Sequence, residues 1–238
     1  MNARERMLGR LRAAAPAQVS GDELKRLDQQ IDLHYDSRRV ALPTQALVES
    51  MQAALAASHA EVFRATERTW PALIAQRLLD ANVKRLLLDT SRAEGAALKQ
   101  ALPSSVATRS YDQPIENWKA ELFDTVDAGF TVARSGLAST GTLIVAPDAG
   151  SPRTMSLVPP LHVALVYAHS LHADLHAAMR AEHWQAGMPT NLVMISGPSK
   201  TSDIQQTLAY GAHGPRELWV VIVEHQTGAA VATDGDAA

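Results

Sequence analysis

Short apolar runs alternate with helical patterns through the central part of the chain. Each run is rich in Val, Leu or Ile and is bounded by polar or turn-forming residues, as is typical of buried strands. Strands that alternate with helices predict a mainly parallel sheet sandwiched by helices, so the fold class is α/β and Rossmann-like. Residues 130–133 fit either a strand or a buried helix. The expected strands are 59–64, 83–89, 106–109, 143–145, 162–167, 191–196 and 218–223, and the expected helices are 45–57, 70–81, 91–101, 117–123 and 169–180.

Both ends of the chain depart from this alternation. Residues 4–14 and 21–34 are each predicted to form a polar helix with a narrow apolar stripe. We therefore interpret residues 1–43 as an N-terminal helical appendage to an α/β domain at 44–226. The tail 227–238 is rich in Gly, Ala and Asp and is expected to be disordered.

Composition and charge exclude several classes of protein. With 238 residues, of which 46% are hydrophobic, the chain has enough apolar side chains for a large core. A net charge of -3 gives no basic excess for nucleic acid or an anionic membrane, and no apolar run reaches transmembrane length. The chain contains no Cys, so it can form no disulfide and can hold no cysteinyl iron–sulfur cluster; a cytoplasmic location is expected.

Three polar, Gly-containing segments, 139–142, 197–203 and 211–215, each adjoin a predicted strand. In a parallel sheet, at least two of them are expected to converge at the carboxyl edge, where open α/β folds bind ligands. A helix is expected at 204–210, and its start would offer free backbone N–H groups to an anion beside Lys200. Each segment also has an ordinary interpretation, as a connection that binds nothing.

Side chains in and near these segments supply the candidate chemistry. Gly141 would let a ligand approach the backbone closely, and the hydroxyls of Thr140 and Thr142 flank it. Arg153 lies in a Pro-rich loop, and its guanidinium suits a carboxylate or a phosphate. Histidines commonly titrate near neutral pH, so His213 is a candidate acid–base group, although a His beside Gly-Pro is as often a turn residue.

His169, His172 and His176 raise the question of a metal site, because positions 172 and 176 would share one face of the expected helix. A metal site usually needs a third ligand, and Asp174 would point elsewhere on that helix. A solvated helix face is therefore the favoured interpretation, and no metal-binding residue is assigned.

Several stretches of the chain together form a recognisable pattern. They are Arg4–Arg12, Ala138–Leu143, Arg153 with Ser156–His162, Gly197–Ile204 and Gly211–Pro215. In this order they resemble the motifs of the lactate-utilisation protein C (LutC/YkgG) family, which is built on the LUD domain. The resemblance spans most of the chain.

The resemblance implies a fold like that of sugar-phosphate isomerases and CoA-transferases. It also implies a role in the oxidation of L-lactate to pyruvate, together with two iron–sulfur partner proteins. The absence of Cys in this chain fits that division of labour. One departure is Ser139, which stands where an acidic residue is expected before Thr-Gly-Thr, so a carboxylate nucleophile is unavailable there.

The leading hypothesis is a cytosolic subunit of an L-lactate-oxidising system that binds a small anionic ligand at the Gly-rich loops. His213 is the candidate catalytic residue, and the sequence identifies no redox cofactor. Two alternatives stay open: a stand-alone enzyme that acts on a phosphorylated or CoA-linked metabolite, and a non-catalytic assembly or regulatory subunit. The predicted ligand-binding residues are Thr140, Gly141, Thr142, Arg153, Gly197, Ser199, Lys200, Thr201, Asp203 and Gly214.

Overall fold

A computed structural model describes residues 2–14, 20–202 and 208–225. The chain divides into two compact units, Met1–Ala41 and Leu42–Ala238. Asp203 and the tail 227–238, for which the sequence makes predictions, lie outside the described residues.

The first unit contains two helices, α1 (Ala3–Ala13) and α2 (Gly21–Asp36), as the sequence predicts. A capping box starts α1: the side chain of Asn2 accepts a hydrogen bond from the Glu5 amide at 2.8 Å, and the Glu5 carboxylate accepts one from the Asn2 amide at 2.9 Å. Neither helix has a buried residue, so the apolar stripe of each helix faces solvent within this unit.

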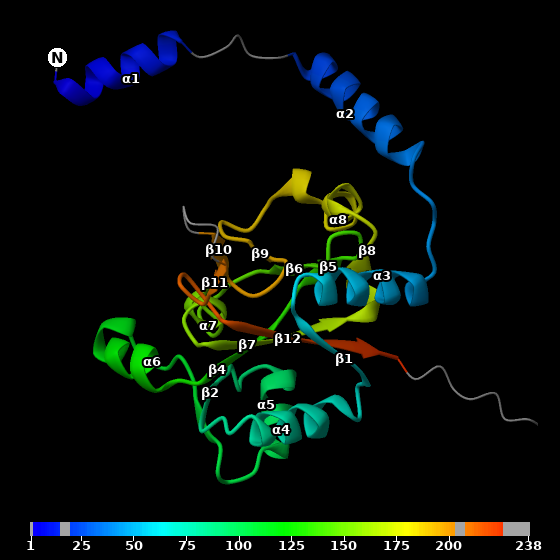
Figure 1. The fold of residues 1–238 in the computed structure, drawn as a ribbon. Coiled ribbons are helices and arrows are strands. Elements are labelled where there is room, and N and C mark those ends of the chain that lie inside the picture. The colour runs from blue at the N-terminus through cyan, green and yellow to red at the C-terminus, as the bar shows by residue number, and fades with distance from the viewer. Residues whose placement is uncertain (1, 15–19, 203–207, 226–238) are drawn as a thin grey trace, which may run out of the picture. The chain divides into compact units, whose positions relative to one another are not determined.

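The second unit is built on a six-stranded sheet in which every paired strand is parallel (Figure 1). This confirms the predicted α/β class. The central strands are apolar on both faces, as strands buried in a parallel sheet must be. The strands, in spatial order, are β1 (Glu61–Thr66), β12 (Glu217–Glu224), β7 (Leu161–Tyr167), β4 (Ala128–Val132), β2 (Arg85–Leu87) and β3 (Ala107–Arg109).

One face of this sheet is covered by α4 (Trp70–Asp80) and α5 (Ala93–Ala101). Pro71 lies in the first turn of α4, where a backbone N–H would have no hydrogen-bond partner within the helix, so its absence costs nothing. The ring of Trp70 stacks on that of Phe130 in β4, with the two centroids 5.7 Å apart. These helices bury the alternate residues of each strand that point to this side.

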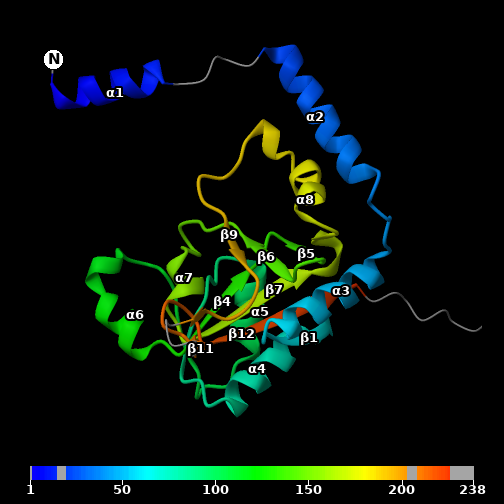
Figure 2. The same cartoon turned by 45° about the horizontal axis from the view of Figure 1, so that its top comes forward.

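The opposite face is covered by α3 (Thr44–Ala57) and by a second, smaller sheet (Figure 2). That sheet has the order β8 (Leu171–His172), β5 (Ser135–Leu137), β6 (Thr142–Val145) and β9 (Val193–Ile195). Its outer side is packed against α8 (Leu175–Ala181) and the short helix η3 (Trp184–Ala186). The sequence did not predict this second sheet.

Shorter elements complete this unit. The strand β2 and α7 pack with α6 in a small apolar cluster of their own. A two-stranded antiparallel ribbon, β10 with β11, precedes β12. These elements are η1 (Ile115–Asn117), α6 (Lys119–Thr125), α7 (Thr154–Leu157), η2 (Ala168–Ser170), β10 (Lys200–Ser202) and β11 (Leu208–Tyr210).

Two predicted helices are wrong in whole or in part. The helix expected at 169–180 begins only at Leu175, because Asp174 caps it and the preceding residues form β8. Residues 208–210 of the helix expected at 204–210 are instead the strand β11, and 204–207 lie outside the described residues. Of residues 130–133, for which the sequence left a choice between strand and helix, residues 130–132 lie in the strand β4 (Ala128–Val132). In the described part of the chain, no helix is long and apolar enough to cross a bilayer.

Close packing between β4 and α7 generates a stability prediction. A Cβ added at Gly129 would lie 2.1 Å from the backbone oxygen of Met155 in α7. Gly129→Ala must therefore displace α7 or bend β4, and we expect it to lower the free energy of unfolding by roughly 1–3 kcal/mol. Denaturant unfolding measures the change. Gly9→Ala in α1 is the control, because a Cβ added there has no atom within 4 Å and causes no clash. A Gly129→Ala variant as stable as the wild type would contradict the tight contact between β4 and α7.

Candidate functional site

A pocket of about 190 Å³ lies where the second sheet meets the amino end of the main sheet. The main sheet contributes His162 and Leu218, which are register partners on β7 and β12. Ser156 and Leu157 of α7 form another part of the wall. Residues 193–198, from β9 and the loop after it, and Pro215 complete the lining.

His162 is the one titratable side chain among the described residues that line this pocket. It is 1% exposed, and its Nε2 lies 2.8 Å from the hydroxyl of Thr131 on β4. Its Nδ1 is buried and has no hydrogen-bond partner among the described residues. Burial lowers the pKa of His162 to about 4, so the ring is neutral at ordinary pH.

The predicted Thr140 and Thr142 belong to a chain of hydroxyl groups that ends at the pocket. The Thr140 and Thr142 hydroxyl oxygens lie 2.7 Å apart, and that of Thr142 lies 2.8 Å from the hydroxyl of Ser196. Ser196 lines the pocket, whereas the two threonines do not. Hydrogen bonds of this kind fix the turn between β5 and β6 against the loop after β9.

Gly141 and Gly197 have φ angles of 59° and 152°, in the region that favours glycine. A Cβ at Gly141 would lie 2.7 Å from the amide nitrogen of Leu55, and one at Gly197 would lie 2.8 Å from the carbonyl oxygen of Ser58. The close approach predicted at Gly141 is therefore made by the end of α3. Gly197 also lines the pocket.

The loop after β9 and the turn before β12 come together through Ser199. Its amide donates to the carbonyl of Pro215 at 2.8 Å, and its own carbonyl accepts from the amide of Gly211 at 2.9 Å. A Cβ at Gly214 would lie 3.1 Å from the Cβ of Ser199. Pro215 precedes β12, so this junction lies at the amino edge of the sheet. The expectation that these segments meet at the carboxyl edge is wrong.

The predicted cations and acid–base group lie outside the pocket lining. Arg153, Lys200 and His213 are all exposed, and none of the three lines the pocket. Thr201 pairs with Ala209 in the β10–β11 ribbon, so its backbone is part of a ladder instead of a helix start. Asp203 is outside the described residues.

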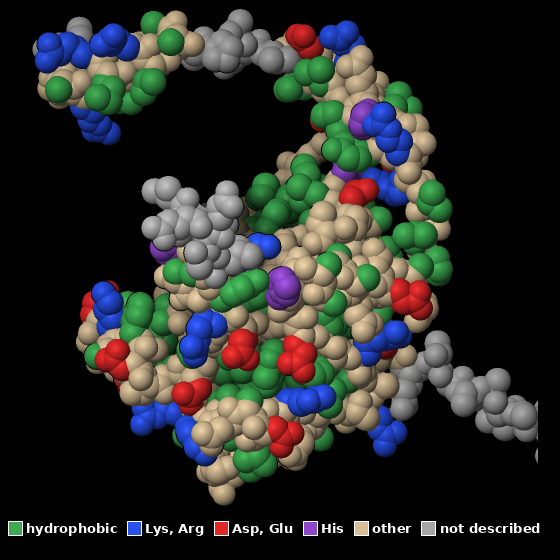
Figure 3. All heavy atoms as spheres, in the orientation of Figure 1, with side chains coloured by type: hydrophobic (Ala, Val, Ile, Leu, Met, Phe, Trp, Pro, Cys, Tyr) green, Lys and Arg blue, Asp and Glu red, His purple; other side chains and the backbone are tan. Residues whose placement is uncertain are grey.

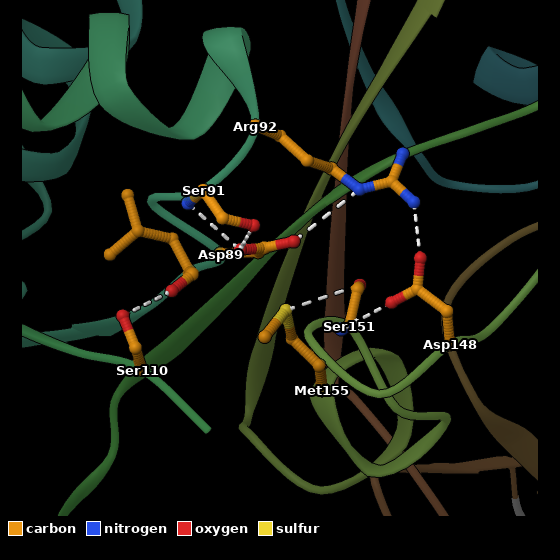
Figure 4. A network of polar contacts seen from close by, with 8 residues as sticks. Asp89, Ser91, Arg92, Ser110, Asp148, Ser151 and Met155 are labelled. Atoms are coloured by element: carbon orange, nitrogen blue, oxygen red, sulfur yellow. Dashed lines mark hydrogen bonds and ion pairs between the residues drawn. The ribbon is translucent and has the colours of Figure 1, made fainter. Parts of the chain in front are cut away.

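A second polar cluster lies at the carboxyl end of β2 (Figure 4). The Arg92 guanidinium binds Asp89 at 3.4 Å and makes a shorter contact with Asp148. Asp148 accepts a hydrogen bond from the Ser151 amide at 2.8 Å. The adjoining void is only about 10 Å³, too small for a ligand. This cluster therefore ties the loop before α7 to the end of β2, and α7 in turn forms part of the pocket wall.

Other charged and metal-ligating side chains give no competing site in the described part of the chain. No three His, Cys, Asp or Glu residues there gather closely enough to hold a metal ion. His172 lies in β8 and His176 in α8, so the shared helix face considered for them does not exist. Figure 3 shows Lys and Arg interspersed with Asp and Glu over the part of the drawn face that carries α4 to α6.

Sequence reasoning missed His162 as a site residue. In the sequence it stands at the end of the Ser156–His162 stretch and at the start of the predicted strand 162–167. The available signal was a polar side chain at the start of the apolar run 162–167, directly after Pro159 and Pro160. A buried polar group inside an otherwise apolar strand is unusual enough to mark a candidate site.

Comparison with known proteins supplies the family context. The family model described as the LUD domain matches residues 48–223. An uncharacterized protein, NMB1437, from Neisseria meningitidis serogroup B is 36% identical over 228 residues, which cover 94% of each chain. A lactate utilization protein C from Halalkalibacterium halodurans is 32% identical over 108 residues, 44% of this chain and about half (47%) of that protein.

A structural relative supports the fold alone. It is the crystal structure of a DUF162-family protein from Deinococcus radiodurans, with a TM-score of 0.56 and 22% sequence identity. The match covers 77% of this chain and 99% of that one.

The neutral, buried His162 predicts a loss of stability in acid. Its pKa is about 4 in the folded protein against 6.5 for an ordinary histidine, so the unfolded state takes up the proton first as pH falls. Its contribution to the free energy of unfolding is intact above pH 6.5 and falls by up to roughly 3 kcal/mol as pH approaches 4. His162→Gln should lack this part of the pH dependence in urea unfolding.

Comparison of the two proteins isolates the effect, because His172, whose pKa burial also lowers, is common to both. Parallel stability curves for wild type and variant would show that His162 is not held neutral by burial.

Proposed function

We propose that this chain, which belongs to the LUD-domain family, takes part in the utilisation of lactate. The observation that carries the proposal is the similarity to proteins named lactate utilization protein C, from Halalkalibacterium and other bacteria. Those alignments span about half of each relative, so the activity of the whole relatives is carried over as a proposal.

The pocket beside His162 supports a small ligand for this role. Its volume of about 190 Å³ is below the roughly 300–1,000 Å³ of sites for drug-sized molecules. A three-carbon acid such as lactate or pyruvate suits this size, whereas a nucleotide or CoA would be too large. The pocket therefore favours the lactate hypothesis over an enzyme that acts on a CoA-linked metabolite.

The remaining predictions form part of the same proposal. Iron–sulfur proteins are the proposed partners, because a chain without Cys cannot hold a cysteinyl cluster for the oxidation. We also propose a cytoplasmic location. Arg153 and Lys200 stay predicted ligand contacts and His213 stays the candidate catalytic residue, and their exposed positions make all three suitable for alanine substitution. An alanine at His213 or Lys200 that left growth on lactate unchanged would favour the alternative of a non-catalytic assembly or regulatory subunit.

Deletion of the gene in its own host tests the proposed function. The deletion strain should lose growth on L-lactate as sole carbon source while growing normally on pyruvate, because only the oxidation step is blocked. Return of the wild-type gene should restore growth. Undiminished growth of the deletion strain on L-lactate would overturn the proposal.

The partner proposal has a separate measurement. The tagged protein, isolated from lactate-grown cells, should carry iron and acid-labile sulfide in a complex that the purified chain alone lacks. Isolation of the protein without iron or sulfide would refute the proposed partners while leaving the role in lactate growth standing.

A further inference from the structure

Among the described residues, the lining of the pocket beside His162 contains no permanently charged side chain. It is formed mainly by apolar side chains from α7, β9, β12 and Pro215, with the hydroxyls of Ser156 and Ser196 and the imidazole of His162 as its polar side chains. Ser156 already donates its hydroxyl to the carbonyl of Arg153 at 3.1 Å. No Asp, Glu, Lys or Arg belongs to the described lining.

The surroundings of His162 within the sheet are similarly uncharged. Its register partners are Leu218 on β12 and Gly129 on β4. Its Nε2 is hydrogen-bonded to the hydroxyl of Thr131. Thr131 also borders the small void that Asp89 and Arg92 line, but those two side chains pair with each other. Nδ1 of His162 is therefore the nitrogen left for a ligand, and because it is buried, the pocket wall must move for a ligand to reach it.

An ionised carboxylate in such a pocket lacks a partner. Burial of an unpaired carboxylate costs many kcal/mol, and a group in that position avoids the cost by taking up a proton or by pairing with a cation. Among its described residues, the lining offers one group that can become a cation, the imidazole of His162. A protonated ring would donate from Nδ1 to the carboxylate while Nε2 donates to the hydroxyl oxygen of Thr131.

We propose that this pocket binds a small 2-hydroxy or 2-oxo monocarboxylate together with one proton, and that His162 holds the proton in the complex. The inference rests on the proposed function, because lactate and pyruvate are the acids that the function supplies. In this proposal the protonated imidazole of His162 is the counter-ion of the carboxylate, and the ring is protonated only when the ligand is bound.

Calorimetric titration of the purified full chain with L-lactate at several pH values tests this coupling. Between about pH 7 and pH 5 lactate is ionised, so uptake of one proton should strengthen binding by up to tenfold for each unit by which pH falls. Lactamide, which has the same shape without the charge, should bind with an affinity that does not change over this range. In proton NMR, the His162 ring should move to its imidazolium position with lactate and stay neutral with lactamide.

Three variants make the assignment specific. His162→Gln should lose most lactate affinity and keep lactamide binding, because an amide cannot carry the proton. His169→Gln places the same change on the exposed residue beyond the carboxyl end of β7 and should bind both compounds as the wild type does. Met194→Trp, at a pocket residue that is 47% exposed and therefore tolerant of a larger side chain, should block both compounds.

Each alternative result overturns a defined part of the inference. Absence of lactate and pyruvate binding, or binding that is unchanged in Met194→Trp, shows that the pocket is not the site. Binding with no pH dependence, or a pH dependence that survives in His162→Gln, removes His162 as the proton carrier. Any of these results can occur in a protein that is still required for growth on lactate, so failure of this inference is distinguishable from failure of the proposed function.

Discussion

The structure depends on burying both faces of β7 and β12. These two strands lie next to each other inside the main sheet, and almost every side chain on them is buried. One face is covered by α4 and α5, and the other needs α3 together with a complete second sheet. The second sheet is short and does not cover the amino ends of β7 and β12 completely. Those ends therefore border a pocket. The position of the candidate site is thus a consequence of how the sheet is covered.

His162 is a polar exception within this apolar layer. A leucine there would satisfy packing without leaving an orphaned ring nitrogen, so the imidazole has an energetic cost that stability alone does not justify. Thr131 offsets part of that cost through one hydrogen bond. Groups that cost stability and line a cavity are the expected signature of a site selected for binding or chemistry. The exposed His213 carries no such cost.

Local patterns predicted most of the main sheet, because apolar runs such as 162–167 and 218–223 can be recognised without knowing their neighbours. They did not predict the second sheet: β6 pairs with β9 some fifty residues later, and both strands are only three or four residues long. The sequence predicts ligand contacts at Gly141 and Gly197, but it does not show that a side chain at either position would meet the backbone at the end of α3. The prediction that the segments 197–203 and 211–215 meet is confirmed by the hydrogen bond between Ser199 and Pro215. They meet at the amino edge of the sheet and not at the predicted carboxyl edge.

The described residues that line the pocket all belong to one of the two compact units. Every described residue that lines it lies between positions 156 and 218, inside the segment that matches the LUD domain. The helices α1 and α2 lie before that segment in the sequence and belong to the other compact unit. Because the described lining lies within one compact unit, the proposed ligand recognition is a property of the α/β domain itself. The proposed counter-ion, the imidazole of His162, belongs to the same domain, so the proposed affinity for an acid does not depend on the exposed cations Arg153 and Lys200.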